Sequence, residues 1–387
     1  MICKAGDQPD RKLKIVFFPA VPPVGYFRQA LPGAALAEQR GHDVVLLQRN
    51  MPRDDSPGAI ADAMAANDKQ TAEAGEDADI VITGAMRSAF NRDYFEHFFP
   101  KAKLVVDMDD AQWEWLAYKN EFLRVTGQTI HRDYEDVLPT LDSWMQGADA
   151  ITVTTELLAE VVRRHTKAPV YVCPNALPSF EGLKPEPNLA GMTAKAKRQL
   201  GWTGSAAHIL DVIQCQAIPA ISQLMRKEIL RVDTSWAPRT MGWLGPADLR
   251  PMLPEKCKCI FNAAVPFPLY YPVLKALNAY AAVIPMQPTA FNRGKSAITL
   301  WSWAAMGTIP IVRCWGPYAV EHYAGFPAVW VHEDTIEAWS EAIESLDNPI
   351  TRMRYKRDCA TFVAEKRSAA RPEYALAYER AFMEIAT

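Results

Sequence analysis

Residues 291–312 read FNRGKSAITLWSWAAMGTIPIV, and this stretch says most about the fold. The pattern predicts a polar loop, a helix that ends at Gly307, and a short buried strand that ends in Arg313. Lys295 and Ser296 fall where the helix begins. Free backbone N–H groups and the positive end of the helix dipole favour an anion there, and a lysine adds positive charge. The segment is a candidate binding site for a nucleotide diphosphate, although an ordinary N-cap with a solvated lysine explains the same residues.

Short apolar runs alternate with helical patterns along the rest of the chain. The expected strands are residues 13–18, 43–47, 79–83, 104–107, 150–154, 169–173, 200–203, 229–232, 259–261, 283–286, 309–312 and 328–331. The expected helices are residues 28–39, 58–74, 156–165, 208–225, 335–345, 350–366 and 373–385. Strands of about five residues separated by helices predict parallel sheets with crossover helices. The fold class is therefore α/β, with two Rossmann-like, doubly wound domains facing each other across a cleft.

A change of composition marks the expected domain boundary. Residues 174–187 contain four prolines, at positions 174, 178, 185 and 187, which is typical of a linker. We expect one Rossmann-like domain over residues 1–175 and a second over residues 176–370. Residues 371–387 are expected to form a C-terminal helix that packs back on the first domain.

Length and composition exclude several classes of protein. A chain of 387 residues exceeds the usual size of a single core, and 49% hydrophobic with 22% charged residues fits a globular protein. The net charge of −3 argues against a strongly basic nucleic-acid coat protein. No run of about 18 apolar residues occurs, and the polar N-terminus lacks the apolar core of a signal peptide, so we expect a cytoplasmic protein. The seven cysteines are scattered, and neither a disulfide framework nor a structural metal site is expected.

Several segments together resemble the GT-B glycosyltransferases of the GT4-like group. Residues 201–208, GWTGSAAH, resemble the loop that opens the donor domain, and residues 295–312 resemble the donor-binding helix and strand. Residues 26–28, with Pro32 and Gly41, are similar to the first loop and helix of the family's acceptor domain. Pro174 and Asn175 resemble the hinge between the two domains of the family. Residues 106–113, VDMDDAQW, resemble the acidic strand end of phage-encoded, DNA-modifying members. The matches run from about residue 13 to residue 331.

The resemblance has one departure. GT4-like enzymes usually carry a glutamate that binds the donor ribose five residues before the glycine that ends the helix. Ser302 stands at that place in this chain. The identity of the nucleotide and of the sugar is therefore less constrained than the fold.

Three carboxylates follow an expected buried strand and are the candidates for catalysis. Asp109 is the first choice as general base, because Asp107 can still belong to the strand and Asp110 can cap the next helix. Aspartates at a strand end are also common as simple N-caps. Asp107 and Asp109 match a DxD metal pattern as well, but that pattern belongs to enzymes with one main domain. A divalent metal is therefore not expected here.

The remaining candidates surround the expected cleft. The donor-binding candidates are Gly204, Ser205, His208, Arg293, Lys295, Ser296, Ser302, Arg313 and Glu321. They supply backbone N–H groups, cations for a departing diphosphate, and polar groups for the sugar or ribose. A structural salt bridge fits Arg313 as well as a donor contact does. The acceptor-binding candidates are Tyr26 and Arg28 on the first loop and Trp113 beside the acidic cluster.

The sequence predicts a glycosyltransferase that moves a sugar from a nucleotide-sugar, with a UDP-sugar favoured, to an acceptor hydroxyl. The acidic motif and a late basic stretch over residues 352–367 suggest 5-hydroxymethylpyrimidine in phage double-stranded DNA as the acceptor, which would place the protein in the host cell cytoplasm. Alternatives are a saccharide or lipid-linked glycan acceptor, a GT-B-shaped nucleotide-sugar epimerase, and a non-catalytic nucleotide-binding module. No cofactor beyond the nucleotide-sugar is expected.

Overall fold

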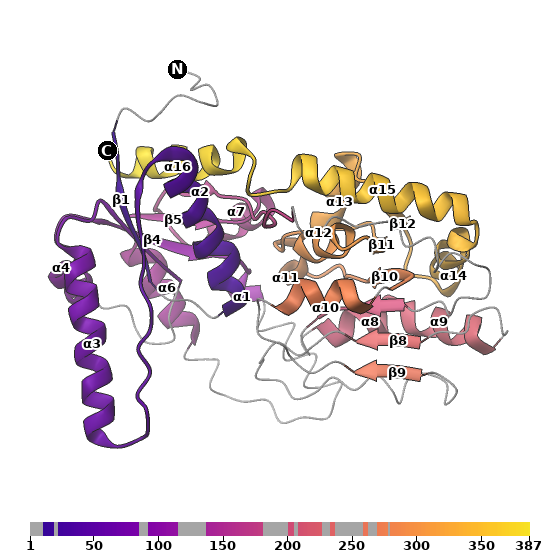
Figure 1. The fold of residues 1–387 in the computed structure, drawn as a ribbon, viewed down its shortest axis with the longest axis horizontal. Helices are drawn as coiled ribbons and strands as arrows, with labels where there is room; N and C mark the ends of the chain where they lie inside the picture. The colour runs from indigo at the N-terminus through magenta and orange to yellow at the C-terminus, as the bar shows by residue number, and fades with distance from the viewer. Residues whose placement is uncertain are drawn as a thin grey trace.

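The computed structural model contains two halves, each built on a parallel sheet (Figure 1). The structure describes residues 11–18, 22–84, 92–114, 137–180, 200–204, 208–226, 233–236, 258–261, 269–277 and 279–387. The expected strand at residues 229–232 lies outside these ranges, as does Ser205. Within the described residues, no helix is both long and apolar enough to cross a membrane.

The first sheet has six parallel strands in the order β2-β1-β3-β4-β5-β6. Its strands are β1 (Lys14–Phe17), β2 (Asp43–Leu46), β3 (Ile80–Gly84), β4 (Lys103–Met108), β5 (Ala150–Val153) and β6 (Val170–Val172). The helical segments of this half are α1 (Pro22–Gly25), η1 (Tyr26–Ala30), α2 (Leu31–Arg40), α3 (Pro57–Gly75), α4 (Arg92–Phe98), α6 (Val137–Gly147) and α7 (Glu156–Val162). The central strands are mostly buried and apolar because hydrophobic clusters cover both faces of the sheet.

The second sheet is also parallel, in the order β12-β11-β10-β7-β8-β9. Its strands are β7 (Leu200–Trp202), β8 (Asp233–Trp236), β9 (Lys258–Phe261), β10 (Ala281–Ile284), β11 (Ile309–Arg313) and β12 (Val329–Val331). Its helices are α8 (Ile209–Gln214), α9 (Ala217–Arg226), α10 (Tyr270–Leu277), α11 (Ala290–Arg293), α12 (Ile298–Ala305), α13 (Pro317–Tyr323) and α14 (Ile336–Glu344). Two further clusters bury its two faces. The α/β class with two facing parallel sheets is therefore confirmed.

Two helices at the C-terminus link the halves. In Figure 1, α15 (Pro349–Lys366) and α16 (Pro372–Ile385), both yellow, run along one edge of the molecule across both halves. Tyr378 and Phe382 of α16 lie in the same buried cluster as β1 and α2. Arg40 of α2 and Glu379 of α16 form a buried ion pair at 2.9 Å. The last helix therefore packs against the first sheet, although it follows the second in sequence.

The chain passes between the halves at two places that lie side by side. Leu177 N–H donates to the carbonyl of Arg367 at 2.7 Å, and Ala369 N–H donates to the carbonyl of Leu177 at 2.7 Å. These two hydrogen bonds join the segment after β6 to the segment between α15 and α16. The two segments that connect the halves are therefore hydrogen-bonded to each other. The strand ends of both sheets line a cavity next to this connection. The boundary expected within residues 174–187 stays a prediction, since residues 181–199 lie outside the described ranges.

Local structure departs from expectation at two sites near the cleft. The single helix expected over residues 208–225 is two helices, because Gln216 adopts a left-handed φ of 61° that interrupts the helical hydrogen bonds. Tyr26 and Arg28, expected on a loop, lie in a π-helical segment in which Leu31 N–H donates to the carbonyl of Tyr26. The short helices α4, α10, α11 and α13 carry too few turns for periodicity to reveal them.

Candidate active site

A cavity of about 240 Å³ lies between the two halves. The first half and the adjoining crossing contribute Val24, Phe27, Arg28, Asp109, Asp110 and Asn175 to its walls. The second half contributes Trp202, Thr203, Gly204, His208, Asp211, Ile284, Pro285, Met286, Lys295, Ser296, Ile298, Thr299 and Tyr318. The carboxyl ends of β4, β7 and β10 lead into these walls, as expected of open parallel sheets. Seven of the predicted site residues meet here, namely Arg28, Asp109, Asp110, Gly204, His208, Lys295 and Ser296.

Asp109 and Asp110 form the acidic wall of the cavity, directly after β4. Burial of the Asp109 carboxyl, reinforced by the charges of Asp110 and Asp107, raises its pKa to about 7. The carboxyl therefore changes between its acid and base forms near neutral pH. A group poised in this way can accept a proton from an alcohol held beside it.

Lys295 brings positive charge to the cavity from the opposite half. Its Nζ lies 2.8 Å from Asp110 Oδ1 and 4.3 Å from the centre of the Phe291 ring. Lys295 and Ser296 precede α12, which begins at Ile298 rather than at the lysine. Ile298 and Thr299 in the first turn of α12 line the cavity, and no side chain caps this helix N-terminus. Its backbone N–H groups and Lys295 therefore lie at the same wall, where they can hold an anion.

A buried carboxylate orients the histidine of the donor side. Asp211, 1% exposed, accepts hydrogen bonds from Asn292 Nδ2 at 2.7 Å and from Gln287 N–H at 2.8 Å. Its other oxygen lies 2.7 Å from His208 Nδ1. With Nδ1 held in this way, Nε2 of His208 is the ring nitrogen left for a ligand in the cavity. Neither Asp211 nor Asn292 was predicted from the sequence to belong to the site. The three-residue spacing of His208 and Asp211 on a helix was the only signal for the pair.

Gly204 stands where a side chain would not fit. A Cβ at this position would lie 2.5 Å from the ring of Trp202, which itself lines the cavity. Next to it, Trp303 Nε1 donates to Thr203 Oγ1 at 3.2 Å. The loop after β7 is thus packed close to two tryptophan rings and exposes its backbone to the cavity.

Asp107 has a different environment from its two neighbours. Arg28, 2% exposed, forms a buried ion pair with it, with Nε donating to Oδ2 at 2.9 Å, and Thr152 Oγ1 donates to Oδ1 at 2.6 Å. Burial opposes the charge of Arg28, but Asp107 and Tyr378 together outweigh that penalty and hold the pKa of Arg28 well above its usual value. Both carboxylate oxygens of Asp107 thus accept hydrogen bonds from buried neighbours. Asp107 is therefore less available than Asp109 as a general base or as a metal ligand, and its catalytic role stays a prediction.

Arg28 continues into a network that reaches the second half. Its Nη1 donates to the carbonyl of Cys173 at 2.6 Å, to Tyr378 Oη at 2.9 Å and to Asn175 Oδ1 at 3.2 Å. Asn175 Nδ2 in turn donates to Ser296 Oγ at 3.0 Å. Arg28 therefore acts mainly as a structural link between the acidic strand end and the start of α12, rather than as the freely placed acceptor contact that the sequence suggested.

Three predicted donor residues lie away from the cavity and are engaged elsewhere. Arg293 pairs with Glu160 of α7 at 2.9 Å, where both side chains are about half exposed. Arg313 pairs with Asp334 at 2.7 Å and donates to the carbonyl of His332 at 2.6 Å. Glu321 is buried, and its carboxylate is held by Arg367 at 2.9 Å. None of the three lines the 240 Å³ cavity, so their contacts with the donor stay predictions. Glu321 lines a second cavity of about 420 Å³, which shares Asn175 and Ser296 with the first.

Three further candidates also fall outside the cavity. Ser302 is 2% exposed inside α12 and lies against the phenols of Tyr270 and Tyr271, so it cannot replace a ribose-binding glutamate. Trp113 stacks on His165 with 3.9 Å between ring centres, and its Nε1 donates to Asp142 at 2.9 Å. Tyr26 is partly buried next to Phe27 and does not line the cavity. Periodicity and motif spacing could not distinguish these packed positions from open ones.

Two parallel, doubly wound sheets that face each other across a cavity define the GT-B glycosyltransferase fold. Comparison with protein-family models finds no match to this chain, and no curated protein matches its sequence. Solved structures do match. WaaG, a glycosyltransferase involved in lipopolysaccharide biosynthesis, is 12% identical over 96% of this chain and 99% of its own, with a TM-score of 0.56.

Three other similar structures, of two proteins, share this architecture. Sucrose-phosphate synthase from Thermosynechococcus elongatus is 13% identical over 96% of this chain and 98% of its own, with a TM-score of 0.63. Anabaena HepE in complex with UDP-glucose is 12% identical over 96% of this chain and 100% of its own, with a TM-score of 0.60. A HepE complex with UDP and glucose also matches, at a TM-score of 0.57 with 12% identity over 96% of this chain and 99% of its own. At these identities the likeness is one of fold.

Proposed function

We propose that this chain is a glycosyltransferase that moves a sugar from a nucleotide-sugar to an acceptor hydroxyl. The observation that carries the proposal is the cavity between the halves, where Asp109 stands on one wall and Lys295 with the N-terminus of α12 on the other. One wall can take a proton and the other can hold a diphosphate. An inverting glycosyl transfer uses both, the first to activate the acceptor hydroxyl and the second to stabilise the leaving diphosphate.

A UDP-sugar is the favoured donor. HepE, which shares this fold, has been solved with UDP and glucose and with UDP-glucose. In this chain the diphosphate would meet Lys295, the N–H groups of the first turn of α12, the backbone at Gly204 and Nε2 of His208. Trp202 and Tyr318 add aromatic surface to the same cavity. Arg293, Arg313, Glu321 and Ser302 are left out of this assignment because of their positions.

The proposed reaction is an inverting displacement. Asp109 accepts the proton of the acceptor hydroxyl as its oxygen attacks the anomeric carbon of the sugar. The bond from that carbon to the nucleoside diphosphate breaks, and the diphosphate leaves with the electron pair and its negative charge beside Lys295 and His208. A retaining reaction would not require a protein base at Asp109.

The acceptor has two candidates. Hydroxymethylated pyrimidine in phage DNA stays a prediction, motivated by the acidic motif of residues 106–113 and the basic stretch of residues 352–367. That basic stretch is partly engaged within the protein. Arg352 donates to the carbonyl of Leu346 at 2.6 Å, Arg357 pairs with Asp358 at 2.8 Å, and Arg367 holds Glu321. This engagement favours a saccharide or lipid-linked glycan, in line with the role of WaaG in lipopolysaccharide biosynthesis.

A thermal-shift screen with UDP, GDP, ADP, CMP and their common sugars tests the donor, because a ligand that binds only the folded state raises the melting temperature. We expect UDP and a UDP-sugar to raise it more than the other nucleotides do. Sugar transfer is then assayed with hydroxymethylated DNA and with saccharides in parallel. Absence of any shift would contradict the donor assignment and favour a non-catalytic module. Release of an epimerised sugar nucleotide without acceptor would identify an epimerase instead.

A further inference from the structure

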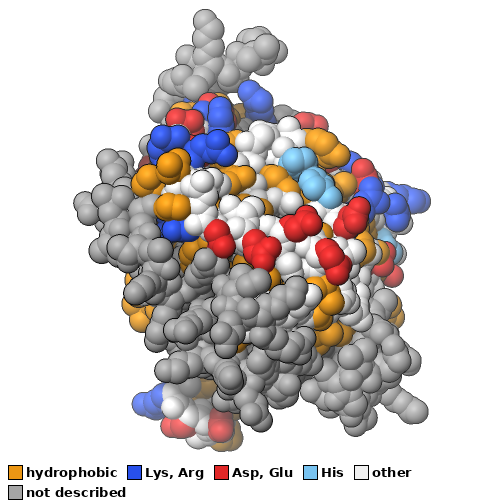
Figure 2. All heavy atoms as spheres, turned by 90° about the vertical axis from the view of Figure 1, so that its right-hand side faces the viewer, with side chains coloured by type: hydrophobic (Ala, Val, Ile, Leu, Met, Phe, Trp, Pro, Cys, Tyr) orange, Lys and Arg blue, Asp and Glu red, His pale blue; other side chains and the backbone are white. Residues whose placement is uncertain are grey.

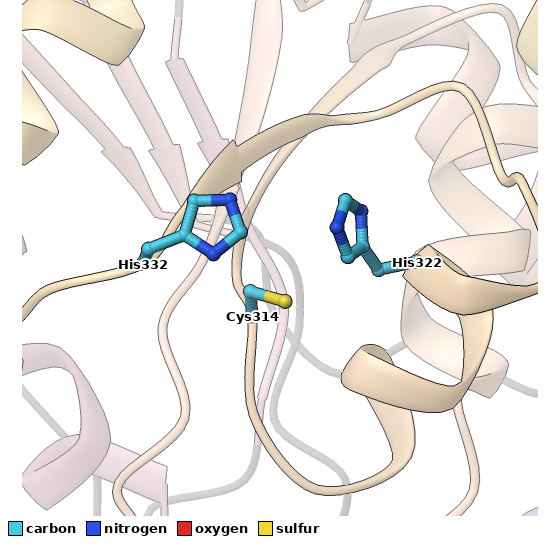
Figure 3. A group of neighbouring side chains, drawn as sticks. All are labelled: Cys314, His322 and His332. Carbon is cyan, nitrogen blue, oxygen red and sulfur yellow. The ribbon is translucent and has the colours of Figure 1, made fainter.

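Three side chains with metal-binding atoms converge outside the cavity. One ring nitrogen each of His322 and His332 and the sulfur of Cys314 all lie within 4.8 Å of one another. Figure 3 shows the two imidazole rings on opposite sides of one small space, with the sulfur of Cys314 pointing into it. Within the described part of the chain, none of these three atoms takes part in a hydrogen bond or an ion pair. None of the three was predicted from the sequence to bind a metal.

The topology of one β-α-β unit explains why they meet. Cys314 directly follows β11 and His332 directly follows β12, and these strands are parallel neighbours with Arg313 opposite Val331. The first residues beyond the two strands therefore lie next to each other at the same sheet edge. His322 lies in the last turn of α13, the helix that connects the two strands. All three side chains thus project from a single compact supersecondary unit.

The backbone of this unit is fixed by hydrogen bonds. Cys314 N–H donates to the carbonyl of Val331 at 2.8 Å, and Arg313 Nη1 donates to the carbonyl of His332 at 2.6 Å. Arg313 is itself paired with Asp334, so its positive charge is neutralised next to the site. The ring of His322 packs edge-on to Trp330 at 5.0 Å between ring centres. Such supporting contacts hold ligands in place before a metal arrives.

We propose that Cys314, His322 and His332 form a binding site for Zn²⁺. Thiolate sulfur and imidazole nitrogen are the ligand atoms that zinc prefers, and three protein ligands leave one tetrahedral position open. Tetrahedral coordination with ordinary zinc distances places such ligand atoms about 3.4–3.6 Å apart. All three pairs of ligand atoms lie within 4.8 Å, so metal binding would draw them closer by at most about 1.4 Å, the difference from those tetrahedral spacings.

Solvent can reach the site. His332 is exposed, whereas Cys314 and His322 are partly buried. Figure 2, which views the molecule from the side of the second half, shows histidine side chains in pale blue at the surface above a row of acidic groups in red. A zinc ion can therefore enter from solvent and take a water molecule as its fourth ligand. The site does not share a residue with the proposed donor cavity, so it can be tested without any assay of sugar transfer.

The test uses the full-length, reduced, metal-free protein. Titration with Co²⁺ as a spectroscopic probe should give one equivalent of tight binding, with intense tetrahedral bands and a thiolate charge-transfer band. Competition with Zn²⁺ should remove both. His332→Ala is expected to weaken Zn²⁺ binding by roughly tenfold or more, and Cys314→Ala to abolish the charge-transfer band. His97→Ala, which removes another exposed histidine, is the matched control and should bind metal as the wild type does.

Cys3 and Cys257 lie outside the described residues and could also bind metal. The triple variant Cys314→Ala/His322→Ala/His332→Ala separates such binding from binding at the proposed site. Circular dichroism first establishes that each variant is folded. Loss of the one-equivalent binding in the folded triple variant supports the proposal. Unchanged stoichiometry and affinity in that variant, or absence of Zn²⁺ binding by the wild type, overturns it. A rise in the melting temperature with Zn²⁺ in the wild type alone provides a second readout.

Discussion

Lys295 Nζ lies 2.8 Å from Asp110 Oδ1, so an ion pair joins the two halves of the molecule across the wall of the cavity. The two residues are 185 positions apart in the chain. The pair places the positive charge of the second half next to the acidic strand end of the first half. A diphosphate carries more negative charge than a single carboxylate and can therefore compete with Asp110 for Lys295.

Lys295→Ala is expected to weaken the binding of UDP and UDP-sugars by roughly 10- to 100-fold, because a hydrogen bond to a charged group contributes about 1.5–3 kcal/mol. Isothermal titration calorimetry measures the change in dissociation constant. Lys275→Ala is the matched control, since Lys275 is an exposed lysine on α10 away from the cavity. Equal donor affinity in wild type and Lys295→Ala would remove the lysine from the diphosphate site.

Asp109→Asn is expected to lower sugar transfer by roughly 10²- to 10⁴-fold and to leave donor affinity within about twofold, because it removes only the proton acceptor. In the wild type, kcat/KM should fall as the pH drops below about 7, since a base with a raised pKa of about 7 becomes protonated there. Steady-state assays between pH 5 and pH 9 measure this decrease in kcat/KM. A wild-type profile flat across that range would contradict the assignment.

The stability of Asp109→Asn provides the control for that experiment. Because the folded-state pKa of Asp109 lies above its unfolded value, the folded protein holds the proton more tightly, and the resulting stabilisation is lost as the pH rises through about 7. The variant should therefore be at least as stable as the wild type at pH 8. Lower stability there would show that its loss of activity reflects unfolding.

Asp107→Asn is expected to behave differently from Asp109→Asn. It leaves the buried Arg28 without its counter-charge, and breaking a buried ion pair by removal of one partner costs about 3–5 kcal/mol. Urea denaturation measures the lower free energy of unfolding. Asp62→Asn, at an exposed aspartate of α3, is the control and should change little. A stable but inactive Asp107→Asn protein would return Asp107 to the catalytic candidates.

Ser302→Glu tests whether a family-like ribose contact can be restored by substitution. We expect a loss of roughly 3–5 kcal/mol in stability and no gain in UDP affinity, because the new carboxylate would be buried against Tyr270 and Tyr271 without a cationic partner. Thermal unfolding with and without UDP measures both effects, and Ser302→Ala serves as the conservative control. Tighter binding of UDP by a stable Ser302→Glu protein would show that the position opens toward the donor.

The sequence by itself determined the class of fold, because short apolar strands and amphipathic helices are local patterns that repeat along the chain. It also placed Asp109, Lys295 and His208 at strand ends and helix starts, which parallel sheets bring to one edge. The tertiary structure alone decided which charged groups remain open to a ligand. Asp107, Arg313 and Glu321 have the same chemistry as the residues of the cavity, but their ion pairs hold them outside its walls.

The same distinction applies to the residues that were missed. Asp211 and Asn292 are 81 positions apart, and Cys314, His322 and His332 come together only because β11 and β12 are parallel neighbours in one sheet. Propensity and periodicity report on contacts within a few residues, whereas ion pairs and ligand sets depend on strand order and on the packing between helices. The sequence therefore determined where polar groups emerge from the fold, and the packing of the two halves decided which of those groups meet.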